Sequence, residues 1–100
     1  MNYKEHSMAT AKARHILVDS EATCIELKTR IEGGEEFAEV AKQYSKCPSG
    51  RRGGELGQFR PGQMVPEFDH VCFNEAVGVV HGPVRTQFGY HLVEVTERSE

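Results

Sequence analysis

The sequence predicts an α+β fold in which helices surround a small, mainly antiparallel sheet. Its length of 100 residues suits one domain with a single core and a single site. Residues 90–95 alternate in the way a strand does, whereas residues 37–44 carry apolar side chains at helical spacing. These patterns occur in the order strand, helix, helix, loop with a short strand, helix, strand, strand.

A strand followed by a helix is expected near the start of the chain. Residues 13–18 are short and rich in residues that favour strands. Asp19 and Ser20 then offer an N-cap for a helix that runs to about Glu32. The apolar stripe of this helix is interrupted only by Lys28.

The second helix leads into a glycine-rich loop. One face of the helix is apolar and consists of Phe37, Val40, Ala41 and Tyr44. Residues 47–62 then hold five of the ten glycines, which favours a shaped loop with room for one short strand at residues 56–59. Too few residues follow for a second domain, so we expect this loop to fold over the surface of the same domain.

The last third of the chain predicts one helix and two strands. Residues 65–73 read as a short helix with Pro66 near its first position. Residues 82–84 suggest a turn and a short edge strand. In the final strand, His91, Val93 and Val95 share one face of the sheet.

The ends and the charge of the chain limit its class. Residues 1–10 are polar and aperiodic, so we expect a flexible N-terminal extension or an expression remnant, followed by a single domain at residues 11–98. No apolar run approaches the ~18 residues that a membrane-spanning helix needs. The net charge of −3 argues against a general electrostatic attraction to nucleic acid or anionic lipid.

Cysteine usage indicates a reducing compartment. Cys24, Cys47 and Cys72 are odd in number, widely spaced and without a Cys-x-x-Cys pair. We therefore expect three reduced thiols, no structural metal and a cytoplasmic location.

Two histidines fall in the middle of predicted strands. His15 shares a face with Ala13 and Leu17, and His91 lies in the last strand. If the first and last strands are neighbours, the two rings can meet across the sheet and share a proton. Thr86 precedes the last strand, where its hydroxyl can fix a tautomer. The alternative is a pair of core histidines with satisfied hydrogen bonds.

Cys47 stands where the second helix gives way to the glycine loop. A thiol there can face the histidines, which raises the alternative of a cysteine hydrolase with His15 or His91 as its base. No hydrolase signature surrounds Cys47, and a zinc site made with the two histidines would lack paired-ligand spacing.

Four apolar residues beside turns form a further candidate site. They are Leu56, Met64, Phe68 and Phe88. They are either ordinary core residues or the lining of a cup for a compact, weakly polar side chain such as a proline ring. Gln63 and Gln87 lie nearby and offer hydrogen bonds to a peptide backbone.

Five sequence blocks follow one another in a characteristic order and spacing. They are His15-Ile16-Leu17-Val18, Cys47-Pro48-Ser49-Gly50, Arg52-Gly53-Gly54-Glu55-Leu56-Gly57-Gln58-Phe59, Pro61-Gly62-Gln63-Met64-Val65-Pro66-Glu67-Phe68 and Gly82-Pro83-Val84-Arg85-Thr86-Gln87-Phe88-Gly89-Tyr90-His91. In these blocks the chain resembles the parvulin family of peptidyl-prolyl cis/trans isomerases. The resemblance covers about residues 11–97, and the chain is most similar to small stand-alone bacterial parvulins.

The resemblance implies a four-stranded antiparallel sheet with about four helices, one of them a short turn near residues 51–54. It implies that the family's histidine pair is His15 and His91, with Thr86 as their companion and Cys47 at the family's cysteine or aspartate position. Its proline cup falls on Leu56, Met64, Phe68 and Phe88. No cofactor is implied, and the expected partners are proline-containing peptides and unfolded or partly folded proteins.

Substrate specificity departs from one branch of the family. Parvulins that act on phosphoserine- or phosphothreonine-proline carry a basic cluster after the first strand, whereas residues 19–21 here are short and acidic. We therefore expect an isomerase that assists folding without requiring phosphate. We also expect a monomer. The rival hypothesis is a peptide-binding module that has the fold but no turnover.

Overall fold

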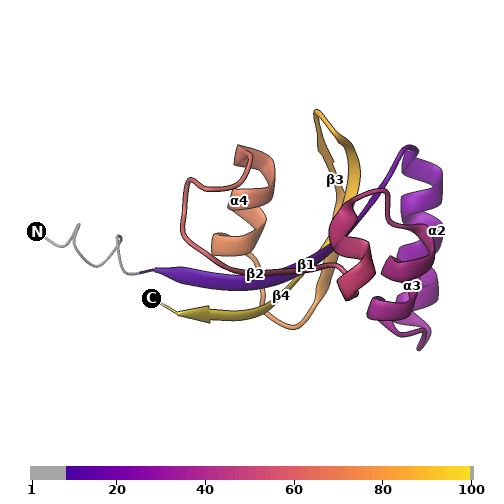
Figure 1. Ribbon diagram of the computed structural model, residues 1–100, viewed down its shortest axis with the longest axis horizontal. Helices are drawn as coiled ribbons and strands as arrows, with labels where there is room; N and C mark the ends of the chain where they lie inside the picture. The colour runs from indigo at the N-terminus through magenta and orange to yellow at the C-terminus, as the bar shows by residue number, and fades with distance from the viewer. Residues whose placement is uncertain (1–8, 100) are drawn as a thin grey trace, which may run out of the picture.

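The computed structural model describes residues 9–99 (Figure 1). Within these residues, four strands and three α-helices follow one another, with one 3-10 helix among them. They are β1 (Thr10–Val18), α2 (Glu21–Glu32), α3 (Phe37–Tyr44), the 3-10 helix η1 (Pro48–Arg52), β2 (Glu55–Phe59), α4 (Pro66–Asn74), β3 (Val80–Thr86) and β4 (Gly89–Ser99). The predicted order of elements is confirmed.

All four strands form one antiparallel sheet in the order β2-β1-β4-β3. The first and last strands are therefore neighbours at its centre, as the histidine hypothesis required. They pair from Thr10 with Ser99 at one end to Val18 with Tyr90 at the other. The short strands β2 and β3 form the two edges.

Each face of the sheet has its own core. Helices α2 and α3 cover one face and α4 covers the other (Figure 1). The α2/α3 core contains Ile16, Val18, Cys24, Leu27, Phe37, Val40, Ala41 and Leu92. The α4 core contains Ala11, Ala13, Phe59, Phe68, Val71, Cys72, Val93 and Val95. This division leaves the α4 face, whose single short helix covers only part of the sheet, to carry the site.

Helix α2 begins and ends as predicted. The Ser20 side chain accepts a hydrogen bond from the backbone N–H of Thr23, and the helix ends at Glu32. Lys28, which interrupts its apolar stripe, donates to the carbonyl of Gly82 on β3 at 3.0 Å. The stripe is thus interrupted where the helix crosses an edge strand and a carbonyl needs a donor.

Three details differ from the predictions. Residues 9–99 form three α-helices rather than four, because the expected fourth is the 3-10 helix Pro48–Arg52. Strand β3 begins at Val80, and β1 begins at Thr10, inside the segment expected to be an extension. Residues 1–8 of that extension lie outside the described residues. No helix within residues 9–99 has the length and apolar character needed to cross a bilayer.

Candidate active site

Two histidines lie side by side on the face of the sheet that α4 covers. The Nδ1 atoms of His15 on β1 and His91 on β4 are 3.0 Å apart, and the rings stack with centroids at 5.2 Å. His91 pairs with Leu17 rather than with His15, so the two rings meet diagonally across the central strand pair. Their exposed fractions are only 6% and 4%. The predicted meeting of the two rings is confirmed.

Thr86 continues this hydrogen-bonded chain at the end of β3. Its Oγ1 lies 2.8 Å from Nε2 of His91 and accepts the backbone N–H of Phe88 at 3.1 Å. Within residues 9–99, His91 is the sole acceptor available to the hydroxyl hydrogen. We infer that the hydroxyl donates to Nε2 of His91, so that His91 carries its proton on Nδ1 and donates to Nδ1 of His15. In the opposite arrangement Nε2–H of His91 donates to Thr86 and Nδ1–H of His15 donates to His91.

Burial keeps both histidines uncharged at neutral pH. Burial, and secondarily the nearby His91, lowers the pKa of His15 to about 4. Burial also lowers the pKa of His91. The site therefore holds two neutral imidazoles whose protons are ordered by hydrogen bonds.

Stability should decrease in mildly acidic solution because of this pair. In the unfolded chain His15 takes up a proton near pH 6.5, whereas in the folded domain it does so only near pH 4. Its contribution is therefore full above pH 6.5 and is lost as the pH falls from 6.5 to 4, by roughly 3 kcal/mol. Urea unfolding at several pH values measures this slope.

Two variants assign the slope to its source. His15→Gln should flatten it, while His70→Gln, which removes an exposed histidine on α4, should retain it. A slope that is unchanged in His15→Gln would contradict the assignment.

Removing the Thr86 hydroxyl should disorder the tautomers. Thr86→Val leaves Nε2 of His91 and the N–H of Phe88 without their buried partner, at a cost of about 1 to 3 kcal/mol. Thr86→Ser keeps the hydroxyl and should retain the protonation of His91 on Nδ1. Long-range ¹⁵N NMR of the imidazoles distinguishes the two variants, and a single unchanged tautomer in Thr86→Val would refute the chain proposed above.

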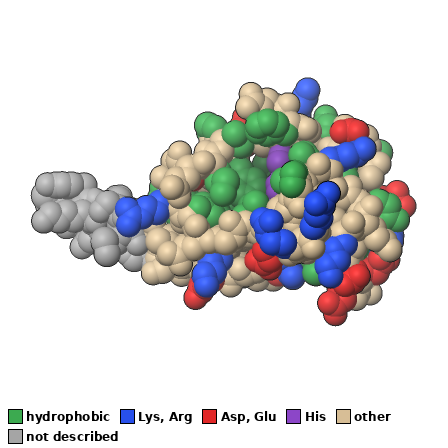
Figure 2. All heavy atoms as spheres, in the orientation of Figure 1, with side chains coloured by type: hydrophobic (Ala, Val, Ile, Leu, Met, Phe, Trp, Pro, Cys, Tyr) green, Lys and Arg blue, Asp and Glu red, His purple; other side chains and the backbone are tan. Residues whose placement is uncertain are grey.

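An apolar cavity of about 380 Å³ lies over the histidines. Figure 2 shows it as a hollow lined by hydrophobic side chains with histidine at its base. Phe68 from α4 closes one side and presents its edge or face to both rings, with centroids 5.5 Å from His15 and 5.8 Å from His91. The cavity is lined by His15, Leu17, Lys46, Cys47, Pro48, Leu56, Met64, Val65, Phe68, Phe88 and His91.

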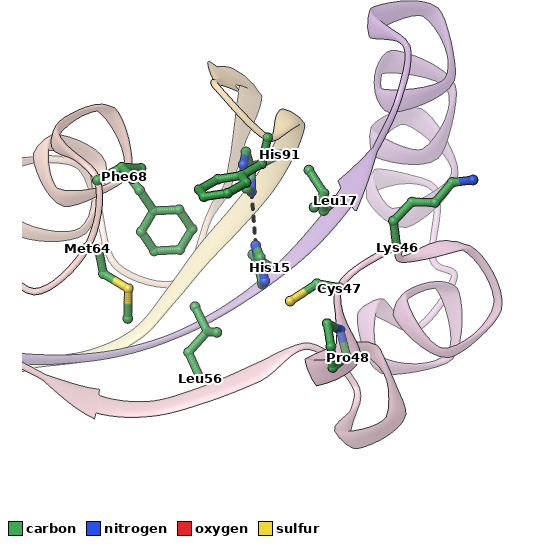
Figure 3. Close-up of a pocket in the computed structure, with 11 residues that line it drawn as sticks. His15, Leu17, Lys46, Cys47, Pro48, Leu56, Met64, Phe68 and His91 are labelled. Atoms are coloured by element: carbon green, nitrogen blue, oxygen red, sulfur yellow. Dashed lines mark hydrogen bonds between the residues drawn. The ribbon is translucent and has the colours of Figure 1, made fainter.

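The labelled side chains flank the histidine pair from two sides (Figure 3). Met64 and Phe68 lie on the side of α4, whereas Leu17, Cys47 and Pro48 lie on the side of η1, with Leu56 below. The ring nitrogen of His15 that faces away from His91, Nε2, is buried without a protein partner within residues 9–99. A concave, largely apolar space between an aromatic wall and a histidine floor suits a small ring attached to a peptide.

Backbone contacts between distant segments place Cys47 at this cavity. The N–H of Lys46 donates to the carbonyl of Leu17 at 2.7 Å, and the N–H of Leu17 donates to Oγ of Ser45 at 3.1 Å. Within residues 9–99, the hydrogen-bond partner of the Cys47 thiol is the hydroxyl of Ser49, at 3.3 Å. Neither histidine bonds to the thiol, so the nucleophile–base contact of a cysteine hydrolase is missing.

The cavity is lined by the four apolar residues predicted to bind substrate, but by neither of the two predicted glutamines, Gln63 and Gln87. Leu56, Met64, Phe68 and Phe88 line it, and Phe88 is 60% exposed at its rim. Gln63 does not line it, because its side-chain carbonyl accepts the N–H of Arg60 within the turn before α4. Nor do residues 9–99 bring together three or more His, Cys, Asp or Glu side chains in the manner of a metal site.

Four lining residues were not predicted. Leu17 could have been predicted, since it lies two residues after His15 in β1 and therefore on the same face. Lys46 lies in a connection held by a backbone bond to β1, Pro48 begins η1 and Val65 precedes α4, and no periodic signal marks these three positions.

This sheet, with a neutral histidine pair beneath an apolar cavity, defines the parvulin class of peptidyl-prolyl cis/trans isomerases. The comparisons with known proteins agree. The chain belongs to the PPIC-type PPIase domain family, whose model matches residues 1–99. The resemblance drawn from the sequence is confirmed.

Its relatives include both long foldases and short parvulins. The chain is 45% identical to the foldase protein PrsA of Geobacillus sp. over 99% of its own length but only 36% of that protein. The crystal structure of PrsA from Bacillus anthracis matches with a TM-score of 0.90 at 37% identity, covering 97% of this chain and 45% of that one. The chain spans about a third of the curated relatives it matches.

A smaller relative is similar over nearly its whole length. Pin from the archaeon Cenarcheaum symbiosum matches with a TM-score of 0.79 at 36% identity, covering 88% of this chain and 92% of that one. The predicted likeness to stand-alone parvulins is thus supported in part.

Proposed function

We propose that this domain accelerates rotation about X-Pro bonds in polypeptides without requiring phosphate, and that it thereby assists folding. The observation that carries the proposal is the apolar cavity above two neutral, buried histidines. Relatives named foldases support the assignment to folding.

The reaction needs no bond formation and no proton loss. Rotation interrupts amide resonance and crosses a barrier of ~20 kcal/mol. The twisted amide is less polar than the planar one, because charge separation between nitrogen and oxygen is lost with conjugation. A dry cavity that grips the ring therefore favours the twisted state, and ~5 to 6 kcal/mol of such differential binding gives ~10⁴-fold acceleration.

In this mechanism the side chains have separate roles. Leu56, Met64, Phe68 and Phe88 hold the proline ring. Cys47 borders the swinging carbonyl and tunes its surroundings. His15, His91 and Thr86 act as positioning residues that keep the floor in one hydrogen-bonded arrangement. Gln63, at the turn before α4, is proposed to bind the peptide backbone outside the cavity.

Exchange NMR on a panel of X-Pro peptides tests the function directly. With catalytic amounts of the protein, Leu-Pro and Glu-Pro peptides should show cis/trans exchange cross-peaks, and phosphoserine-Pro should gain no special advantage. Chemical-shift changes without faster exchange would instead identify a peptide-binding module, and exchange limited to the phosphopeptide would overturn the lack of a phosphate requirement.

Cys47→Ser should retain most of the activity. Serine keeps a polar group at the same place, so kcat/KM is expected to fall by no more than about twofold if the thiol only tunes the carbonyl environment. The same exchange measurement reports this value. Loss of all activity in Cys47→Ser, or a trapped thioester on the wild-type protein, would identify Cys47 as a nucleophile.

The state and location of the domain are also proposed. We infer a monomer that binds polypeptide rather than nucleic acid or membrane, supported by its net charge of −3. The three cysteines, which are free thiols in the fold, support the cytoplasm as its compartment. Sedimentation at several concentrations tests the first inference, and cell fractionation tests the second.

A further inference from the structure

A second groove opens beside the apolar cavity. It has a volume of about 350 Å³ and shares Lys46, Cys47 and Pro48 with the cavity lining. From there it extends over the end of α3 and along η1, where Lys42 and Arg51 contribute to its walls. A polypeptide held in the cavity can therefore continue into this cationic groove without leaving the surface.

The charged side chains that line the cationic groove are all positive. Three of its lining residues are Lys42, Lys46 and Arg51, and none of the residues of the described part of the chain that line it is acidic. Figure 2 shows Lys and Arg side chains gathered beside the hydrophobic hollow. This positive surface occurs on a chain whose net charge is −3, so it is a local feature and not a consequence of composition.

These cations are available to a ligand. Lys42 pairs with Glu39 at 3.5 Å and Lys46 with Asp19 at 3.4 Å, and all four side chains are at least half exposed. Exposed pairs of this kind contribute little and are readily exchanged for another carboxylate. Arg51, which is exposed, forms no ion pair within residues 9–99.

We propose that the cationic groove binds acidic side chains flanking the X-Pro bond that occupies the cavity. This inference rests on the proposed isomerase function and adds a substrate class to it, namely prolines beside an Asp- or Glu-rich stretch. Consecutive residues of an extended peptide advance by ~3.3 Å, so carboxylates a few residues from the proline reach the groove while the ring stays in the cavity. Continuity with the cavity favours a polypeptide over a free anion.

The test compares matched peptides that differ in charge alone. Each contains the same Leu-Pro pair and carries either Glu or Gln at three positions before the pair, or at three positions after it. In the peptide whose charged positions reach the cationic groove, Glu should lower KM by about three- to fivefold relative to Gln without changing kcat. This advantage should disappear in high salt. Exchange NMR measures both constants, and its Gln peptides also report the basal activity.

Protein variants locate the effect. The double variant Lys42→Gln/Arg51→Gln leaves the cavity lining intact and should abolish the preference for Glu while the Gln peptides are turned over normally. Arg60→Gln removes one positive charge from the loop that follows β2, outside the groove. This variant should keep the preference for Glu. Equal KM values for Glu and Gln peptides, or a preference that persists in the double variant, would overturn the proposal. Absence of turnover for every peptide would overturn the isomerase function itself.

Discussion

Replacing Phe68 by alanine should remove most of the isomerase activity and cost about 3 to 5 kcal/mol of stability. The ring is only 3% exposed and contacts both histidines as well as Phe59. Its loss opens the wall against which a proline ring would pack, so we expect kcat/KM to fall by about 10- to 100-fold. Urea unfolding and exchange NMR under conditions where the variant is folded measure the two effects.

Phe73→Ala is the matched control for that experiment. Phe73 lies on the same helix and packs edge-to-face on Phe59, with centroids at 5.8 Å, but does not line the cavity. Its truncation should cost about 1 to 3 kcal/mol and leave kcat/KM nearly unchanged once the folded fraction is taken into account. Equal losses of activity in both variants would show that α4 acts through stability alone.

Among the glycines of residues 9–99, Gly54 is the one at which alanine should be most disruptive. Gly54 has a φ of +88°, and an added Cβ would collide with the backbone carbonyl oxygen of His15. The same two residues are joined by a hydrogen bond from the N–H of His15 to the carbonyl of Gly54, at 3.0 Å. We expect a loss of about 3 to 5 kcal/mol from the left-handed backbone and the displaced strand together, and a histidine pair moved out of hydrogen-bonding distance.

Gly57→Ala separates these two causes. Gly57 also has a positive φ, +77°, but an added Cβ there would meet no atom within 4 Å. Only the conformational cost of about 1 to 2 kcal/mol should appear, and the imidazole NMR signals should be unchanged. If both variants lose the same stability and both keep the imidazole signals, close approach to His15 is not what requires glycine at position 54.

The sheet and the histidine pair could be predicted from the sequence for a physical reason. Side chains alternate strictly along a strand, so the sequence pattern alone assigns His15 and His91 each to one face of its strand. Once β1 and β4 pair in the observed register, the two histidines lie on the same face of adjacent strands, within contact distance of each other. Thr86 could be predicted as their companion because the turn between β3 and β4 is short, which keeps its hydroxyl near His91.

The remainder depends on contacts that spacing does not encode. Lys46 and Pro48 line the cavity because the chain after α3 is held along β1 by the Lys46–Leu17 backbone bond. Gln63 was expected to face the substrate, yet its carbonyl is used by its own turn. Irregularities between Lys12 and Ala13 also shift the β1–β4 register, which no apolar period reveals.

The pairing of Thr10 with Ser99 has a consequence for how such a domain can be combined with others. Adjacent strands lie ~4.8 Å apart, so the polypeptide enters and leaves the sheet at almost the same point. A host protein could accept the domain as a cassette within one surface loop, because the two sides of that loop would hardly have to separate. A short linker joining these ends, with a new opening in the loop before α4, should likewise give a circular permutant that keeps both cores.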